Sequence, residues 1–240
     1  MRIRALAVAP LLLAVLAVLA GCTPGGAPPP RAHYQAPSNG ESRKAGPEVA
    51  KDAAAALLHA GAVTVEGHLT ADGADQDVTF NLQGGDLTGT VLTRGQAVQV
   101  VVWEDDTYAK GPAAFWRDAG LPADAAARLA GRWVQHAERA VGRLTPISLT
   151  WLADVVRDPA ASVEPDVHLG TADAGPLTGT PVAVVTRVDG STIQVAAAGP
   201  PYPLVIENPG GHDGDLGLSA FEEGATVVPP AHAVDLASTL

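Results

Sequence analysis

The sequence predicts an α+β protein in which helices are segregated to one face of a large antiparallel sheet of about 10–11 strands. Two observations predict this class. Apolar residues recur at helical spacing near the start and in the middle of the chain, whereas most other segments alternate between apolar and polar residues. The elements follow the order helix, strands, helices, strands, which is typical of this architecture. A sheet of that size is expected to curl or split.

The first half of the body is expected to hold one helix and a five-stranded meander. Pro47 can open a helix, Val49, Ala53 and Leu57 follow at helical spacing, and Gly61 can end it. Alternating segments separated by glycine-containing turns then predict strands. These strands cover residues 63–70, 78–83, 87–93, 97–104 and 107–110.

The fourth of these strands is apolar on both sides. Val98, Val100 and Val102 point to one face, and Val101 and Trp103 point to the other. We therefore expect a strand that is covered on both faces, with helices on one of them.

The second half of the body is expected to hold helices and then strands. Helices are predicted over residues 112–119, 122–130 and 146–157, with a short strand near Trp133. Further strands are predicted over residues 168–173, 180–188, 192–198, 202–207, 215–219 and 225–228. The last ten residues carry no strong pattern.

Composition excludes several classes of function. The chain has 240 residues, of which 47% are hydrophobic and only 4% aromatic, and a formal net charge of −11. Such an acidic chain is not expected to bind nucleic acid, which requires a basic surface. A single cysteine, Cys22, excludes an intramolecular disulfide and a cysteine-cluster metal site.

The N-terminus carries the strongest local signal. Arg2 and Arg4 precede an almost wholly apolar run over residues 5–20, which describes a secretory signal. The ending Leu19-Ala20-Gly21-Cys22 resembles the bacterial lipobox. This resemblance implies cleavage between Gly21 and Cys22 and modification of Cys22 to an N-palmitoyl, S-diacylglycerol cysteine. The alternative is an ordinary signal peptide in which the cysteine is incidental.

Four regions follow from these features. Residues 1–21 are a lipoprotein signal peptide, and residues 22–45, rich in proline and glycine, are a flexible tether. Residues 46–232 are a single folded domain, and residues 233–240 are a C-terminal tail. The protein is expected at the cell membrane, anchored by lipid on the extracytoplasmic face, because more than one acyl chain anchors a protein firmly.

Several segments of the mature chain resemble the LppX/LprG-type lipoproteins of mycobacteria and their actinobacterial relatives. They are the lipobox, the helix-then-strand opening 54–70, and the run Thr107-Tyr108-Ala109-Lys110-Gly111 leading to Phe115-Trp116. Segment 130–134 and the ending from 202–204 through 218–219 to 228–229 also match. Segment 208–215 departs from the family pattern.

The resemblance implies a fold and a function. The fold is a strongly curved antiparallel half-barrel with helices on its concave face, similar to the carriers LolA and LolB. The function is the binding of an acylated lipid or glycolipid in an apolar cavity between sheet and helices, and its transport through the envelope. A membrane transporter is a further candidate partner. The family brings no catalytic motif.

Motifs for catalysis or metal binding are absent from the sequence. No Gly-x-Ser-x-Gly elbow or phosphate-binding glycine loop occurs, and the seven histidines do not have the spacing of zinc ligands. The polar segments 104–106, 212–215 and 222–224 are better interpreted as turns. We therefore expect no enzyme, no cofactor and no metal, although a hydrolase with a dispersed site stays an alternative.

The aromatic residues of the helical middle are candidates for lining a lipid cavity. The candidate cavity residues are Phe115, Trp116, Trp133, Trp151, Leu152 and Val155. Each of them could equally serve as core filling between helices and sheet. The main alternative for the whole protein is a non-enzymatic envelope scaffold or interaction module without a lipid cavity.

Overall fold

The body of the protein is an α+β fold built on one large curved sheet. The computed structural model describes residues 38–71, 73–142, 144, 147–157, 163–171 and 179–239. Twelve strands form one open sheet in the order β12-β6-β5-β4-β3-β2-β1-β11-β10-β9-β8-β7. The predicted fold class is confirmed, with a sheet close to the expected 10–11 strands. Strand β12 was not predicted, because its two residues leave no alternating pattern.

The first half follows the predicted order closely. Helix α1 spans Gly46–Ala60 and ends at Gly61, whose φ of 65° places it in the left-handed conformation that favours glycine. A five-stranded antiparallel meander follows. It consists of β1 (Ala62–Ala71), β2 (Ala74–Gln83), β3 (Asp86–Thr93), β4 (Gln96–Trp103) and β5 (Asp106–Lys110).

The middle of the chain is helical. It holds α2 (Ala113–Asp118), α3 (Ala123–Leu129), the short strand β6 (Val134–Gln135), α4 (Glu138–Val141) and α5 (Leu149–Arg157). Helix α4 has only one turn, and the sequence analysis missed it. Helix α5 begins where the Ser148 hydroxyl accepts a hydrogen bond from the Trp151 backbone N–H (3.1 Å). The position at which this helix was predicted to start, residue 146, lies outside the described residues.

The remaining strands complete the sheet on the other side of β1. They are β7 (Val163–Thr171), β8 (Pro181–Arg187), β9 (Thr192–Ala196), β10 (Pro203–Glu207) and β11 (Gly214–Ser219). Strand β11 pairs with β1, so the C-terminal strands join the first meander in the middle of the sheet. This long-range pairing makes the two halves one domain.

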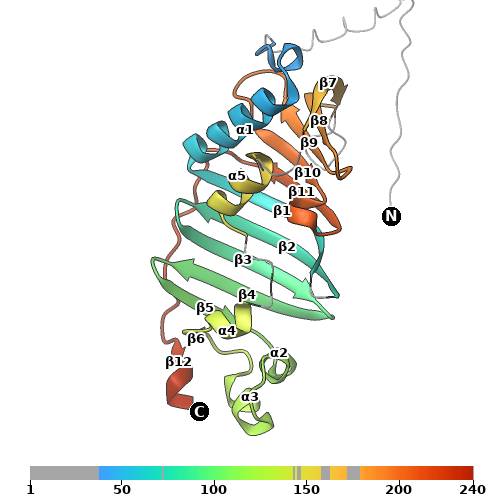
Figure 1. Cartoon of the computed structure of the whole chain (residues 1–240). Helices are drawn as coiled ribbons and strands as arrows, with labels where there is room; N and C mark the ends of the chain where they lie inside the picture. The colour runs from blue at the N-terminus through green and yellow to red at the C-terminus, as the bar shows by residue number, and fades with distance from the viewer. Residues whose placement is uncertain are drawn as a thin grey trace, which may run out of the picture. The chain divides into compact units, whose positions relative to one another are not determined.

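Helices cover one face of the sheet, which we call the inner face (Figure 1). Helices α1 and α5 lie across one part of it, and α2, α3 and α4 lie towards the β5 end. The main core lies between them and alternate strand residues such as Val65, Phe80 and Val98. Gly89 on β3 lies directly beneath the Phe80 ring, and a Cβ there would lie 2.8 Å from the Phe80 Cα. This close approach explains a glycine inside a strand.

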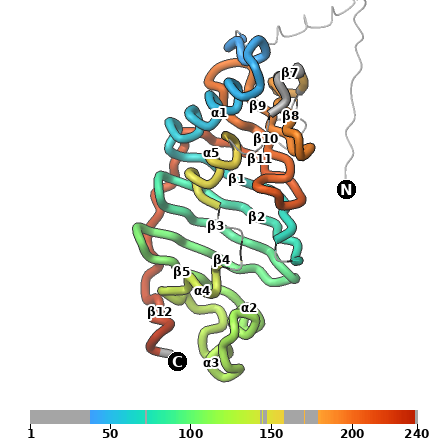
Figure 2. Tube along the Cα trace, in the orientation of Figure 1, coloured from blue at the N-terminus to red at the C-terminus, as the bar shows by residue number. Residues whose placement is uncertain are grey.

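The opposite, outer face is crossed by a C-terminal strap, residues 220–233. Val227 of the strap packs on Val101 and Tyr108, and the Val234 N–H donates to the Trp133 carbonyl (2.9 Å). Figure 2 shows the chain running from β11 to β12 beside the meander. The predicted strand at 225–228 is therefore wrong: its apolar residues cover the sheet without pairing into it. The expectation that β4 is covered on both faces is confirmed.

The two ends of the described chain are held by the body. Strand β12 (Val234–Asp235) pairs in parallel with β6, followed by the 3-10 turn η4 (Leu236–Thr239), so residues assigned to a tail join the sheet. At the other end, the Asn39 side chain donates to the Ala196 carbonyl (2.8 Å). The body thus extends upstream of the predicted start at Gly46. Within the described ranges, no helix has both the length and the apolar character that crossing a membrane requires.

Candidate functional site

An apolar pocket of about 310 Å³ opens on the inner face at one end of β2, β3 and β4. Its floor is made by alternate strand residues, which the pleat directs towards the helices. Its cover comes from α4, from the start of α5 and from Leu144 between them. The apolar lining residues are Phe80, Leu82, Leu87, Val100, Val102, Val141, Leu144, Ile147 and Leu149.

A few polar groups stand among the residues lining this apolar pocket. Asp86, Thr107, Glu138 and Ser148 contribute to the lining. A volume of this size, with an apolar lining and few polar groups, falls in the range of roughly 300–1,000 Å³ that is typical of small-molecule sites. The pocket therefore suits the apolar part of a ligand.

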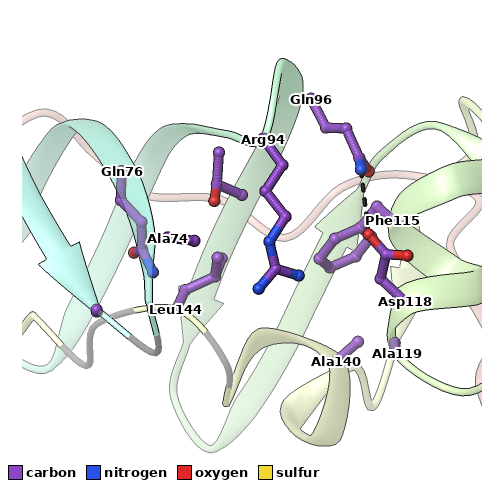
Figure 3. A pocket seen from close by; sticks show the side chains of 11 residues that line it. Ala74, Gln76, Arg94, Gln96, Phe115, Asp118, Ala119, Ala140 and Leu144 are labelled. Carbon is purple, nitrogen blue, oxygen red and sulfur yellow. Dashed lines mark hydrogen bonds between the residues drawn. The ribbon is translucent and has the colours of Figure 1, made fainter.

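A second pocket, of about 400 Å³, lies on the same face at the other end of the same strands. Its lining is more polar: it includes Gln76, Arg94, Gln96 and Asp118, beside the ring of Phe115. The Gln96 amide donates to the Asp118 carboxylate (3.2 Å), and Figure 3 shows the Arg94 side chain extending into the space between these residues and Leu144. We call this the polar pocket.

Leu144 lines both pockets. Its side chain is buried, and its backbone N–H donates to the Val141 carbonyl (2.7 Å) at the end of α4. On β2, Gln76 lines the polar pocket, whereas Phe80 and Leu82, nearer the other end of the strand, line the apolar pocket. The two pockets therefore lie along the same strands, with Leu144 between them. Among the described residues, Leu144 is thus the one side chain that both pockets share.

Three of the sequence-predicted cavity residues lie near these pockets or in the core beside them. Phe115 lines the polar pocket and meets Trp116 edge-on, with ring centroids 4.9 Å apart. Trp116 is completely buried in the main core, and its indole N–H has no hydrogen-bond partner among the described residues. Leu152 is likewise completely buried, on the face of α5 that packs into the core.

The other three lie further from the pocket linings. Val155 is buried on α5, and its carbonyl accepts a hydrogen bond from the buried Arg187 guanidinium. Trp151 is partly buried against the same core. Trp133 lies on the outer face, where the Lys110 ammonium stands 5.9 Å from its ring centroid. Assignment of these six residues to a lipid cavity stays a prediction.

Sequence reasoning missed most of the residues that line the two pockets. The strand residues Phe80, Leu82 and Val100 were interpreted only as one apolar face, and Arg94 only as part of a turn. The available signal was the alternation of β2 and β4, which places these residues on the helix-covered face. The sequence does not show that α4, Leu144 and the start of α5 lie over these strands, and their placement forms the pockets.

Titratable groups elsewhere give little sign of catalytic chemistry. Among the described residues, no group of three or more His, Cys, Asp or Glu side chains is arranged to hold a metal ion. On the outer face, the hydrogen bond from His68 to Asp77 (2.8 Å) raises the pKa of the imidazole. Of the turn predicted over 104–106, residues 104 and 105 form the hairpin turn and Asp106 begins β5, with the Glu104 N–H donating to the Asp86 carboxylate (2.9 Å).

Comparison with solved structures adds a structural likeness to the resemblance in sequence. No family model matches the chain, and no curated protein matches it. The chain is similar to the crystal structure of LprF from Mycobacterium bovis, a lipoprotein of the LppX/LprG family that the sequence resembles. The two share 16% sequence identity and a TM-score of 0.48, over 78% of this chain and 97% of LprF. Residues 21 and 22, the predicted cleavage and lipidation site, lie outside the described residues.

Proposed function

We propose that the protein is a membrane-anchored lipoprotein of the cell envelope that binds the acyl chains of a lipid or glycolipid and helps to move that lipid across the envelope. The observation that carries the proposal is the apolar pocket between the sheet and the α4–α5 segment. The lipobox ending at Cys22 supports the anchor, since it joins the only cysteine of the chain to an apolar signal.

The size of the apolar pocket is consistent with part of one acyl chain. A volume of about 310 Å³ holds about ten water-sized groups at ~30 Å³ each. Ten methylenes at about 0.8 kcal/mol each would contribute about 8 kcal/mol before the costs of ordering the ligand. Affinity would therefore come mainly from apolar burial, and a longer chain would extend past Leu144 or towards solvent.

Native mass spectrometry tests the binding step. The whole mature chain, residues 22–240 with Cys22→Ser to remove the anchor, is produced in an actinobacterial host and purified without detergent. The expected result is a mass above that of the polypeptide, resolved on denaturation into one or two acylated lipids. A bare polypeptide that also gains no mass with added phospholipids or glycolipids would reject lipid binding. An envelope scaffold or interaction module would then be the better interpretation.

A second experiment tests the anchor separately. The full-length chain is expected to incorporate labelled palmitate and to sediment with membranes, whereas Cys22→Ser is expected to do neither. Equal membrane association of both proteins would show that something other than the lipidated cysteine holds the chain. This experiment is independent of the pocket, so each half of the proposal can fail alone.

A further inference from the structure

The polar pocket contains one cation, the side chain of Arg94, an exposed residue in a tight turn at the rim of the sheet. Arg94 and Gly95 form the two-residue turn between β3 and β4, with φ values of 49° and 72°. Positive φ at both central residues is the geometry of a type I′ turn, in which asparagine or glycine is the usual first residue. Arginine at this position is therefore not explained by the turn, and its side chain extends over the inner face into the pocket (Figure 3).

The Arg94 guanidinium makes no hydrogen bond or ion pair with any described residue. The carboxylate in the same pocket, Asp118, instead accepts a hydrogen bond from the Gln96 amide (3.2 Å). Among the described residues that line either pocket, Arg94 is also the one cationic side chain. A guanidinium stays charged at any physiological pH and offers five N–H donors, so this one can donate to a ligand.

The two pockets together define an amphiphilic site. A ligand with its acyl chain among the apolar strand residues can place its polar end past Leu144, at Arg94. Guanidinium forks match phosphate oxygens with two parallel hydrogen bonds. The chain as a whole has a net charge of −11, so its overall field repels anions and attraction has to come from a local cation.

We propose that Arg94 binds the phosphate group of an anionic lipid whose acyl chain occupies the apolar pocket. This inference rests on the proposed lipid-binding function and deepens it, because it selects lipids with a phosphate close to the acyl chains over neutral lipids.

The turn geometry supplies a variant that removes the charge without straining the fold. Arg94→Asn places a favoured residue in the type I′ turn, so its thermal unfolding is expected to match or exceed that of the wild type. Arg94→Lys keeps the positive charge but lacks the paired N–H donors of the guanidinium. The matched control is Arg43→Asn, since Arg43 is an exposed cation in the 3-10 turn η1 (Glu41–Arg43) and lines neither pocket.

The measurement compares three probes by native mass spectrometry and calorimetry on the whole mature chain with Cys22→Ser. The probes are phosphatidic acid, diacylglycerol with the same acyl chains, and inorganic phosphate alone. We expect phosphatidic acid to bind at least about tenfold more tightly than diacylglycerol, because a hydrogen bond to a charged group is lost with the neutral lipid. Arg94→Asn should abolish this difference and leave diacylglycerol binding unchanged, whereas Arg43→Asn should preserve it.

Each outcome decides the question. Equal binding of phosphatidic acid to the wild type and to Arg94→Asn would overturn the role of Arg94 while leaving lipid binding intact. Inorganic phosphate bound as tightly as phosphatidic acid, and lost in Arg94→Asn, would show a free-anion site and overturn the lipid assignment. Failure of the wild type to bind either lipid, although another lipid co-purifies with it, would overturn this inference and leave lipid binding intact. Failure to bind either lipid in a protein that also co-purifies with no lipid and gains no mass with added glycolipids would reject the proposed function itself, and this inference with it.

Discussion

Filling the apolar pocket should block acyl-chain binding without unfolding the protein. Val102 lies on the inner face of β4 and lines this pocket, and its side chain is only partly buried. Val102→Phe adds four carbon atoms at a place where the pocket offers about 310 Å³ of free volume. The larger ring should therefore enter the pocket rather than force neighbouring side chains apart.

The expected size of the effect follows from the methylenes that the ring displaces. Four methylenes at about 0.8 kcal/mol each amount to about 3 kcal/mol, which is roughly a 100-fold loss of affinity. The unfolding temperature should stay the same or rise, because added apolar atoms bury surface without creating strain.

The assay is titration with a fluorescent fatty-acyl probe, alongside thermal unfolding of each variant. Val188→Phe is the matched control: it adds the same atoms at an exposed side chain next to the β8–β9 turn, away from both pocket linings. Unchanged affinity in a folded Val102→Phe protein would refute the placement of the acyl chain in this pocket. Equal loss in both variants would mean that the effect is not local.

Three further predictions concern the scaffold. Arg187→Met should lower the free energy of unfolding, measured in urea, by about 2–3 kcal/mol. The reason is that the buried guanidinium donates to two backbone carbonyls at the end of α5. A decrease of less than about 0.5 kcal/mol would mean that these hydrogen bonds contribute little to stability. Gly89→Ala should lower the free energy of unfolding by about 1–3 kcal/mol, because a Cβ would collide with Phe80 and the β2 backbone. Gly85→Ala is the control and should leave stability nearly unchanged, since a Cβ at this position meets open space. Equal losses of stability in the two variants would contradict the prediction. Burial and a hydrogen bond to Glu222 raise the pKa of Tyr202 to about 12, above the usual 10. The free energy of unfolding should therefore fall as the pH rises from about 10 to 12. Tyr202→Phe should make this dependence on pH less steep, and an unchanged dependence would show that Tyr202 is not its source.

Local sequence patterns predicted the first half of the fold well. Alternation from Ala62 to Lys110, broken by glycine turns, is determined by neighbouring residues alone, and the meander forms as expected. The two faces of β4 were also assigned correctly, since successive side chains of a strand point to opposite sides. What that alternation could not reveal was the cover of the outer face by Val227, more than a hundred residues further along the chain.

Elements without a long pattern were the ones missed. Helix α4 has four residues and β12 has two, and neither offers a period that can be recognised, whereas β6 lies where a short strand was predicted near Trp133. Segment 225–228 was assigned to a strand because it is apolar. Its residues pack on β4 and β5 instead, because side chains from those strands leave an apolar surface there.

Sequence reasoning predicted only part of the candidate site. Phe115 was a candidate because it is one of the aromatic residues of the helical middle, and it does line a pocket. Arg94, Gln96 and Leu144 were not found, because their part in the polar pocket depends on which segments cross the inner face. Trp133 was grouped with the cavity candidates, yet the pairing of β6 with β5 places it on the outer face.

The sequence by itself determined the α+β class and the alternating strands, because each depends on residues close together in the chain, and it carries the lipobox-like ending on which the proposed anchor rests. The tertiary structure decided where the free volume lies. Pockets arise where α4, Leu144 and the start of α5 lie over β2, β3 and β4 without filling the space beneath them. That packing joins residues from 71 to 149, and no local pattern records whether such surfaces fit together or leave a gap.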